Sequence, residues 1–101
     1  PFTLWASAER SAAFGNSATL NLWFGVSGPM SRFLVPEPAA EPARRDELWR
    51  STCFECFLKE ERQVAYREWN FSPSGDWATY DFTATREGMA DAPVANPPYL
   101  R

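Results

Sequence analysis

The chain has 101 residues, 45% of them hydrophobic, which limits it to one domain and excludes disorder along its whole length. The net charge is −3 and no basic stripe is present, so nucleic-acid binding is not expected. Histidine is absent, which removes the commonest general base and zinc ligand and excludes catalysis by Ser-His-Asp or Cys-His groups within this chain. No apolar run approaches the roughly 18 residues that a membrane span needs.

Two strands with a turn between them are predicted in the first third of the chain. Residues 2–9 have weak strand character, and Gly15-Asn16 within residues 11–16 is typical of a turn. Apolar side chains then alternate with other side chains over Ala18–Ser27, which predicts a half-buried strand that ends at Gly28-Pro29. The apolar face of this strand carries Leu20, Leu22, Phe24 and Val26, and the other carries Thr19, Asn21, Trp23 and Gly25.

Proline interrupts the middle of the chain. Residues 32–35 form a short extended run that Pro36 closes. Residues 36–42 contain three prolines, which excludes a strand interior or a stable helix. We expect a surface loop here that continues to Asp46.

Residues 52–59 predict the next strand. Large apolar side chains occur on both of its faces, with Phe54 and Leu58 on one and Phe57 on the other. A strand with two apolar faces is expected in the centre of a sheet, covered on both sides. Residues 59–62 are charged and predict a turn.

A β-hairpin is predicted next. Residues 64–71 and 77–83 alternate as strands, and Ser72-Pro73-Ser74-Gly75 between them is a strong turn sequence. Residues 86–88 predict another turn, residues 91–98 are proline-rich, and residues 99–101 resemble the start of a strand. Five to six short strands without helical periodicity predict an all-β, antiparallel sandwich or barrel.

Cys53 and Cys56 have the C-x-x-C spacing, but they fall within a predicted strand. Side chains three residues apart on a strand point to opposite faces, so the two sulfurs cannot pair or chelate one ion. We interpret both as buried structural cysteines rather than a redox or metal site. Unpaired thiols favour a reducing compartment, and therefore a cytoplasmic location.

Glu55 lies in the strand that is predicted to be covered on both faces, so its carboxylate requires a partner. Arg50, Arg67 and Arg86 are the candidates. Two interpretations stay open: a buried structural ion pair, or a carboxylate that hydrogen-bonds a polar ligand. Glu68 and Asn70 share a face of the following strand and would lie beside Glu55 if the strands pair; a glycosidase with Glu55 and Glu68 is therefore a hypothesis.

Aromatic residues make up 16% of the chain and include five tryptophans. A flat indole can stack on the C–H face of a sugar ring, while neighbouring polar side chains bind its hydroxyls. The alternative for any single tryptophan is a place in the core. The aromatic set of interest is Trp49, Trp69, Trp77 and Tyr80.

The run Leu-Trp-Arg-Ser-Thr-Cys-Phe-Glu-Cys-Phe-Leu at residues 48–58 resembles the signature of bacterial DOMON-like domain proteins, which are related to family 9 carbohydrate-binding modules. Residues 66–82, with the pattern Tyr-x-Glu-x-Asn-Phe-Ser-Pro-Ser-Gly-x-Trp, resemble the next motif of that family. Residues 86–89 and the strand that ends at Gly28 extend the resemblance to roughly residues 20–89.

The resemblance implies a jelly-roll-like β-sandwich that binds sugar or haem. Family 9 modules hold a sugar between two tryptophans, with charged and amide side chains around it. Cys53 stands where relatives commonly have Asp, and haem binding is disfavoured because His is absent. The positions that correspond to the family's motifs are Trp49, Glu55, Asn70, Trp77 and Arg86.

Family domains are nearly twice as long as this chain, so residues 1–101 are expected to form one incomplete domain, the N-terminal half of the family's length. Such a domain would expose edge strands and an apolar face. We therefore expect it to pair with a second copy of itself or with another chain.

The sequence thus predicts a non-catalytic, carbohydrate-binding β-sandwich module with a small saccharide as ligand and without cofactor, metal, nucleic-acid or membrane partner. The alternative is a structural or protein-interaction sandwich without a sugar site, and the third hypothesis is the hydrolase. The predicted ligand-binding residues are Trp49, Trp69 and Trp77 for stacking, and Glu55, Asn70 and Arg86 for polar contacts.

Overall fold

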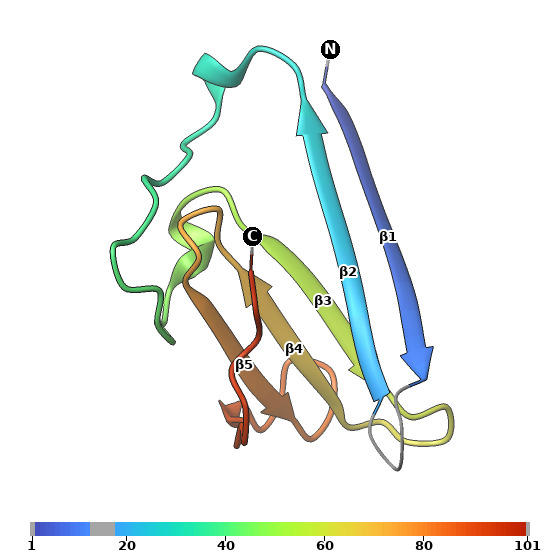
Figure 1. Cartoon of the computed structure of the whole chain (residues 1–101). Coiled ribbons are helices and arrows are strands. Elements are labelled where there is room, and N and C mark those ends of the chain that lie inside the picture. The colour runs from blue at the N-terminus through green and yellow to red at the C-terminus, as the bar shows by residue number, and fades with distance from the viewer. Residues whose placement is uncertain (1, 13–17, 101) are drawn as a thin grey trace. The chain divides into compact units, whose positions relative to one another are not determined.

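The computed structural model describes residues 2–12 and 18–100 (Figure 1). All of the strands in these residues belong to antiparallel sheets, one of two strands and one of four, which confirms the predicted all-β, antiparallel class. In chain order the elements are β1 Thr3–Ala12, β2 Ala18–Ser27, the 3₁₀ helix η1 Met30–Arg32, the 3₁₀ helix η2 Leu48–Arg50, β3 Phe54–Lys59, β4 Tyr66–Phe71, β5 Trp77–Phe82 and β6 Ala90–Asp91.

The chain divides into two compact units, the first ending at Phe33 and the second beginning at Leu34. Each unit contains one of the two sheets. The jelly-roll sandwich that the family resemblance implies stays a prediction. Among the described residues the helical segments are two three-residue turns, and neither has the length or apolar character that a bilayer span requires.

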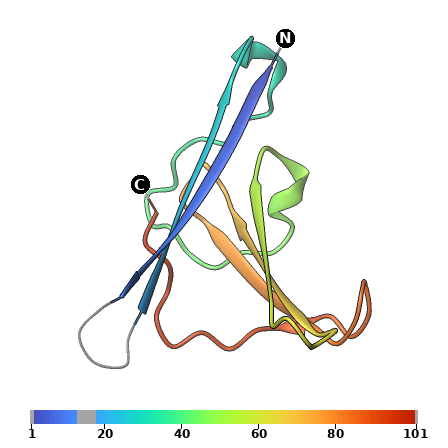
Figure 2. The same ribbon diagram turned by 90° about the vertical axis from the view of Figure 1, so that its right-hand side faces the viewer.

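The first unit is a long hairpin, and Figures 1 and 2 both show its two strands side by side. β1 and β2 pair from Thr3 opposite Ser27 to Ala12 opposite Ala18. Because side chains alternate between faces, the register places Leu4 of β1 on the same face as Phe24 and Val26 of β2. The apolar face predicted for β2 is therefore shared by both strands.

The predicted bounds of the second strand are confirmed, whereas β1 is longer than residues 2–9 and includes Ser11, which was assigned to a turn. The amide of Asn21 donates to the Ser11 hydroxyl across the strands at 3.2 Å, and this bond supports the pairing there. Gly15 and Asn16, the predicted turn residues, lie outside the described residues.

The second unit contains the four-stranded sheet, in the order β3-β4-β5-β6. β4 and β5 form the predicted hairpin, from Tyr66 opposite Phe82 to Phe71 opposite Trp77. In its loop the Ser72 N–H donates to the Asp76 carbonyl at 2.9 Å, and Gly75 has φ +98°, a conformation that favours glycine. The turn chemistry of residues 72–75 therefore sets the hairpin register.

β3 was predicted to be the central strand, and this prediction is wrong. β3 is the first strand in the sheet order, with β4 as its strand neighbour, and Glu55, Phe57 and Leu58 are exposed. Two apolar faces indicated coverage, but pairing on only one side leaves the strand half open. The central strand with the deepest burial is β5, where Trp77, Ala78, Thr79 and Tyr80 are buried.

A loop segment completes the surroundings of β5. Ala43 and Arg45 flank the first residue of β5, because the Trp77 N–H donates to the Ala43 carbonyl at 3.2 Å and the Arg45 N–H donates to the Trp77 carbonyl at 2.9 Å. The Arg44 guanidinium donates to the carbonyls of Thr79 at 2.5 Å and Ala92 at 2.8 Å. This arginine therefore joins the loop, β5 and the segment that follows β6.

Three further boundaries differ from the sequence predictions. Residues 32–35 were expected to be extended, but Arg32 closes the 3₁₀ helix η1. β6 was not predicted, because residues 91–98 are proline-rich and only Ala90 and Asp91 pair with β5. Tyr99 and Leu100 are not in a strand, and Arg101 lies outside the described residues. The predicted turn at residues 86–88 is confirmed, with positive φ at Arg86 and Gly88.

Candidate functional site

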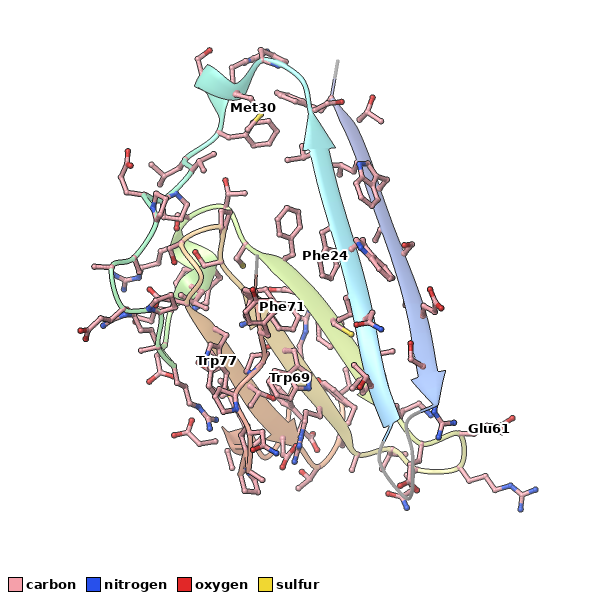
Figure 3. The ribbon with its side chains drawn as sticks, viewed as in Figure 1. Phe24, Met30, Glu61, Trp69, Phe71 and Trp77 are labelled. Carbon is pink, nitrogen blue, oxygen red and sulfur yellow. The ribbon has the colours of Figure 1, made fainter. Side chains whose placement is uncertain are left out.

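The register of the four-stranded sheet separates its side chains into two faces. One face, which we call the acidic face, carries Glu55 of β3, Glu68 and Asn70 of β4 and Tyr80 of β5. The opposite face, which we call the tryptophan face, carries Cys56, Trp69, Phe71, Trp77 and Thr79. Figure 3 shows Trp69 and Phe71 on β4 and Trp77 on β5.

The six predicted ligand-binding residues are distributed over both faces and two loops. Glu55 and Asn70 are direct cross-strand partners on the acidic face. Trp69 and Trp77 lie on the tryptophan face, so they cannot contact the same small ligand as those two polar residues. Trp49 lies in η2 and Arg86 in the turn after β5.

Trp69 and Trp77 belong to a packed aromatic cluster. The Trp69 ring lies 6.0 Å from the rings of both Phe71 and Trp77. Trp77 is only 8% exposed, and the Arg44 guanidinium lies 5.5 Å from the centre of its ring. Because so little of it is exposed, Trp77 acts as a core residue and does not offer an open ring face.

Glu55 was expected to lie in a covered strand, as part of a buried ion pair or as a ligand-binding carboxylate, and the expected burial is wrong. Glu55 is exposed, and the strand that carries it, β3, lies at the edge of the sheet. Two of the three candidate partners bind other carboxylates: Arg50 pairs with Glu47 at 3.3 Å, and Arg67 pairs with Asp81 at 2.7 Å. Within the described residues, Glu55 is therefore not part of a buried ion pair.

Glu68 is the half-buried carboxylate of the acidic face. Burial raises the pKa of its carboxyl group, and the negative charge of Glu55 raises it further. The Asn70 amide opposes this rise by donating to Glu68 at 3.5 Å. The proximity of Glu55 and Glu68, which the strand pairing predicted, is confirmed.

Asn70 is the most deeply buried of the predicted polar residues, at 3% exposure. Its Nδ2 donates to Glu68, but its Oδ1 finds no hydrogen-bond donor among the described residues. A buried amide oxygen without a donor lowers stability by about 1–3 kcal/mol relative to a satisfied one. The helix η2, with Trp49, lies against β4, the strand that carries Asn70.

The two cysteines are free thiols, in agreement with the prediction that they do not pair. They are half-buried rather than fully buried, because Cys53 precedes an edge strand and Cys56 lies in it. Burial raises the pKa of both thiols, and the charges of Glu55 and Glu68 raise that of Cys53 further. A raised pKa keeps the thiolate scarce, which disfavours nucleophilic or redox chemistry. Within residues 2–12 and 18–100, no group of three potential metal ligands comes together.

A hollow of about 340 Å³ lies where η2 and the loop before it approach β5 and β6, and its size is within the range of small-ligand sites. Tyr80, on the acidic face, donates its hydroxyl to Asp46 at 2.6 Å. Burial, this hydrogen bond and the charges of Asp46 and Asp91 raise the pKa of Tyr80, so the phenol stays protonated. The lining residues are Asp46, Glu47, Trp49, Tyr80, Met89, Ala90 and Asp91.

Trp49 supplies the exposed aromatic surface of this hollow, with 63% of the residue accessible. The guanidinium of Arg50 lies 5.5 Å from the centre of its ring, and the ion pair with Glu47 holds Arg50 nearby. Glu47 itself has φ +60°, a left-handed conformation that turns the chain into η2. The hollow therefore combines one stacking surface, Trp49, with carboxylates from the loop before η2 and from β6.

Asp46 and Asp91 are the site residues that the sequence analysis missed. Asp91 reaches the hollow because it pairs with Tyr80 across β5 and β6, and β6 was not predicted. Asp46 lies near the hollow because Arg44, two residues before it, forms a backbone β-bridge with Trp77. No sequence pattern connects these two carboxylates, although a polar residue directly after a proline-rich loop was a weak indication.

Arg86 lies away from the polar residues of the acidic face. Its residue is exposed, and its backbone N–H donates to the Tyr66 hydroxyl at 3.2 Å. Tyr66 is four residues from Asn70 along β4, a spacing of about 13 Å at roughly 3.3 Å per residue. The hydrogen bond to Tyr66 therefore holds the backbone of Arg86 away from Asn70.

Comparison of the chain with family models, with curated proteins and with solved structures finds no match. The resemblance of residues 48–58 and 66–82 to DOMON-like domains stays a prediction.

Proposed function

We propose that the chain is a non-catalytic carbohydrate-binding module, and that a small saccharide binds in the Trp49 hollow. The observation that carries this proposal is the exposed indole of Trp49 beside a hollow that Asp46 and Asp91 also line. The resemblance of residues 48–58 to a group that includes sugar-binding modules supports the same class. The proposed stacking residue is therefore Trp49, in place of Trp69 and Trp77.

The chemistry of the hollow suits a polyhydroxylated ring. The C–H face of a sugar stacks on an indole, and carboxylate oxygens accept hydrogen bonds from its hydroxyl groups. The hydrogen bond from Tyr80 engages one carboxylate oxygen of Asp46, and in the proposed complex the other accepts from a sugar hydroxyl. The negative charge around the hollow favours neutral sugars and amino sugars over acidic ones.

The proposal is non-catalytic because neither Glu55 nor Glu68, the carboxylates of the hydrolase hypothesis, lines the hollow. A protein-interaction role is the second candidate. It is favoured by the large apolar side chains that are exposed among the described residues. Examples are Leu4, Trp5, Leu34, Phe57 and Val64.

A tryptophan-fluorescence titration tests the proposal. The chain is titrated with glucose, cellobiose and glucosamine, beside Trp49→Ala and the matched control Trp23→Phe, which removes an exposed tryptophan of the first unit. We expect a saturable change that Trp49→Ala abolishes, that Asp91→Asn weakens and that Trp23→Phe keeps. A folded sample that responds to no sugar, or a Trp49→Ala variant that binds as well as the unmodified chain, would refute a sugar site in this hollow.

A further inference from the structure

The outer edge of β3 pairs with no other strand in the part of the chain that the structure describes. Just before the strand, the Thr52 N–H donates to the Leu34 carbonyl at 2.8 Å, so the edge is covered up to that point. From Glu55 to Lys59, the strand pairing of the described residues is with β4, on one side of β3. An open edge presents backbone donors and acceptors in a row, which is a template for another strand.

The side chains of β3 do little to block such pairing. Natural edge strands are commonly protected by proline, by bulges or by charges in the middle of the strand. β3 contains no proline, and its register with β4 is continuous over all six residues. Its central residue on the acidic face is Phe57, which is 56% exposed.

The charges of β3 complement each other when the strand meets a second copy of itself. Glu55, Phe57 and Lys59 follow one another on the acidic face, so an acidic and a basic residue are equally spaced from Phe57. In an antiparallel pair with a twofold axis at Phe57, Glu55 of each copy lies opposite Lys59 of the other, and the two Phe57 side chains meet. On the opposite face, the same register places Cys56 against Leu58.

Other registers lose this complementarity. Moving the axis by one residue, to Cys56, places Glu55 opposite Phe57, and parallel pairing in register places like charges side by side. The ammonium group of Lys59 is also positioned at the strand end, because it donates to the carbonyls of Glu60 at 3.2 Å and Gln63 at 3.0 Å. The positive charge therefore lies at the end of β3, where the partner's Glu55 would arrive.

We infer that two copies of this chain associate through β3, edge to edge and antiparallel about Phe57, and so join their four-stranded sheets into one continuous sheet. This inference is independent of the proposed sugar site, because no β3 residue lines the Trp49 hollow. The partner of the β3 edge is therefore a second copy of the chain, selected by two reciprocal ion pairs between Glu55 of one copy and Lys59 of the other.

Charge reversal tests the pairing. Glu55→Lys and Lys59→Glu each place like charges opposite one another twice in a homodimer, and each is expected to raise the dimer dissociation constant about tenfold or more in sedimentation equilibrium. Mixing the two variants restores both attractive pairs, so the mixture is expected to form heterodimers. The control is Glu61→Lys, in the turn after β3 (Figure 3), which makes the same change of net charge as Glu55→Lys. Because Glu61 lies outside the paired strand, we expect this variant to leave dimerisation unchanged.

Hydrogen exchange of the unmodified chain provides a measurement that requires no variant. The amides of residues 54–59 that face away from β4 are expected to exchange more slowly at high than at low protein concentration. A chain that stays monomeric at every concentration, single variants that dimerise as well as the original, or a mixture that fails to associate would each overturn the inference. Protection that appears only after an unrelated protein is added would identify a different occupant and would also overturn it.

Discussion

Trp77 and Trp49 illustrate how differently two tryptophans of the same four-stranded unit are used. Trp77 begins β5, pairs with β4 on one side and with the Ala43–Arg45 segment on the other, and is covered by Arg44. Trp49 lies in a three-residue 3₁₀ helix and exposes most of its surface beside an acidic hollow. The difference teaches that backbone pairing on both sides, rather than residue type, makes a tryptophan structural. Stability should therefore depend on Trp77, and ligand binding on Trp49.

The largest expected effect is that of Trp77→Ala. Removing a buried indole leaves a cavity and the uncovered Arg44, and we expect the free energy of unfolding to fall by about 3–5 kcal/mol. Urea denaturation followed by circular dichroism measures this change. A loss below about 1 kcal/mol would show that Trp77 is not a core residue and would remove the contrast with Trp49.

Arg44→Ala should have the next largest effect. It removes two charge-assisted hydrogen bonds, to the carbonyls of Thr79 and Ala92, together with the contact over Trp77. We expect a loss of about 2–3 kcal/mol in the same denaturation experiment. Arg62→Ala, an exposed arginine in the turn between β3 and β4, serves as the control and should change stability by less than about 0.5 kcal/mol. Equal losses in the two variants would argue against a bridging role for Arg44.

Glu68→Gln probes the acidic face, which also carries Tyr80. The pKa of Glu68 is raised in the folded chain, so its ionisation weakens folding at pH values above the folded pKa, and this penalty is absent below the ordinary pKa of a glutamate. Replacing it with glutamine should stabilise the chain at pH 7 by less than about 1 kcal/mol. The gain should fade as the pH falls through the range in which Glu68 takes up its proton. Denaturation curves of both chains at several pH values measure this, and a gain independent of pH would show that the ionisation of Glu68 is not its cause.

Trp49→Ala is expected to have the smallest effect on stability and the sharpest effect on function. Because the side chain is largely exposed, its removal should change the free energy of unfolding by less than about 0.5 kcal/mol. Saccharide affinity should nevertheless fall by about tenfold or more, since a stacking contact is lost. The denaturation and titration experiments above provide both values, and a stability loss as large as that of Trp77→Ala would break the comparison.

Local patterns predicted the elements that depend on neighbours in the sequence. The alternation of Ala18–Ser27 predicted the bounds of β2, and Ser72-Pro73-Ser74-Gly75 predicted the hairpin of β4 and β5. These predictions succeed because side-chain period and turn conformation are set by a few adjacent residues. The pairing of Glu55 with Asn70 followed from the same alternation once β3 and β4 were adjacent.

The candidate site was less predictable, because it depends on contacts between distant segments. Asp46 and Asp91 are 45 positions apart in the sequence, and a two-residue strand brings Asp91 to Tyr80. Two of the predicted tryptophans, Trp69 and Trp77, pack against each other in an aromatic cluster, so motif position alone did not separate stacking residues from core residues.

The sequence by itself determined the all-β class, the two-residue alternation of each strand and the turn that joins β4 to β5, since these follow from local sterics and hydrophobic period. Only the tertiary structure decided that β3 is an edge strand and β5 an interior one, because strand order depends on which segments pair. It likewise decided that Trp77 is buried while Trp49 stays largely exposed beside Asp46 and Asp91. Burial and proximity of this kind arise from long-range hydrogen bonds, such as those of Arg44, which no local pattern encodes.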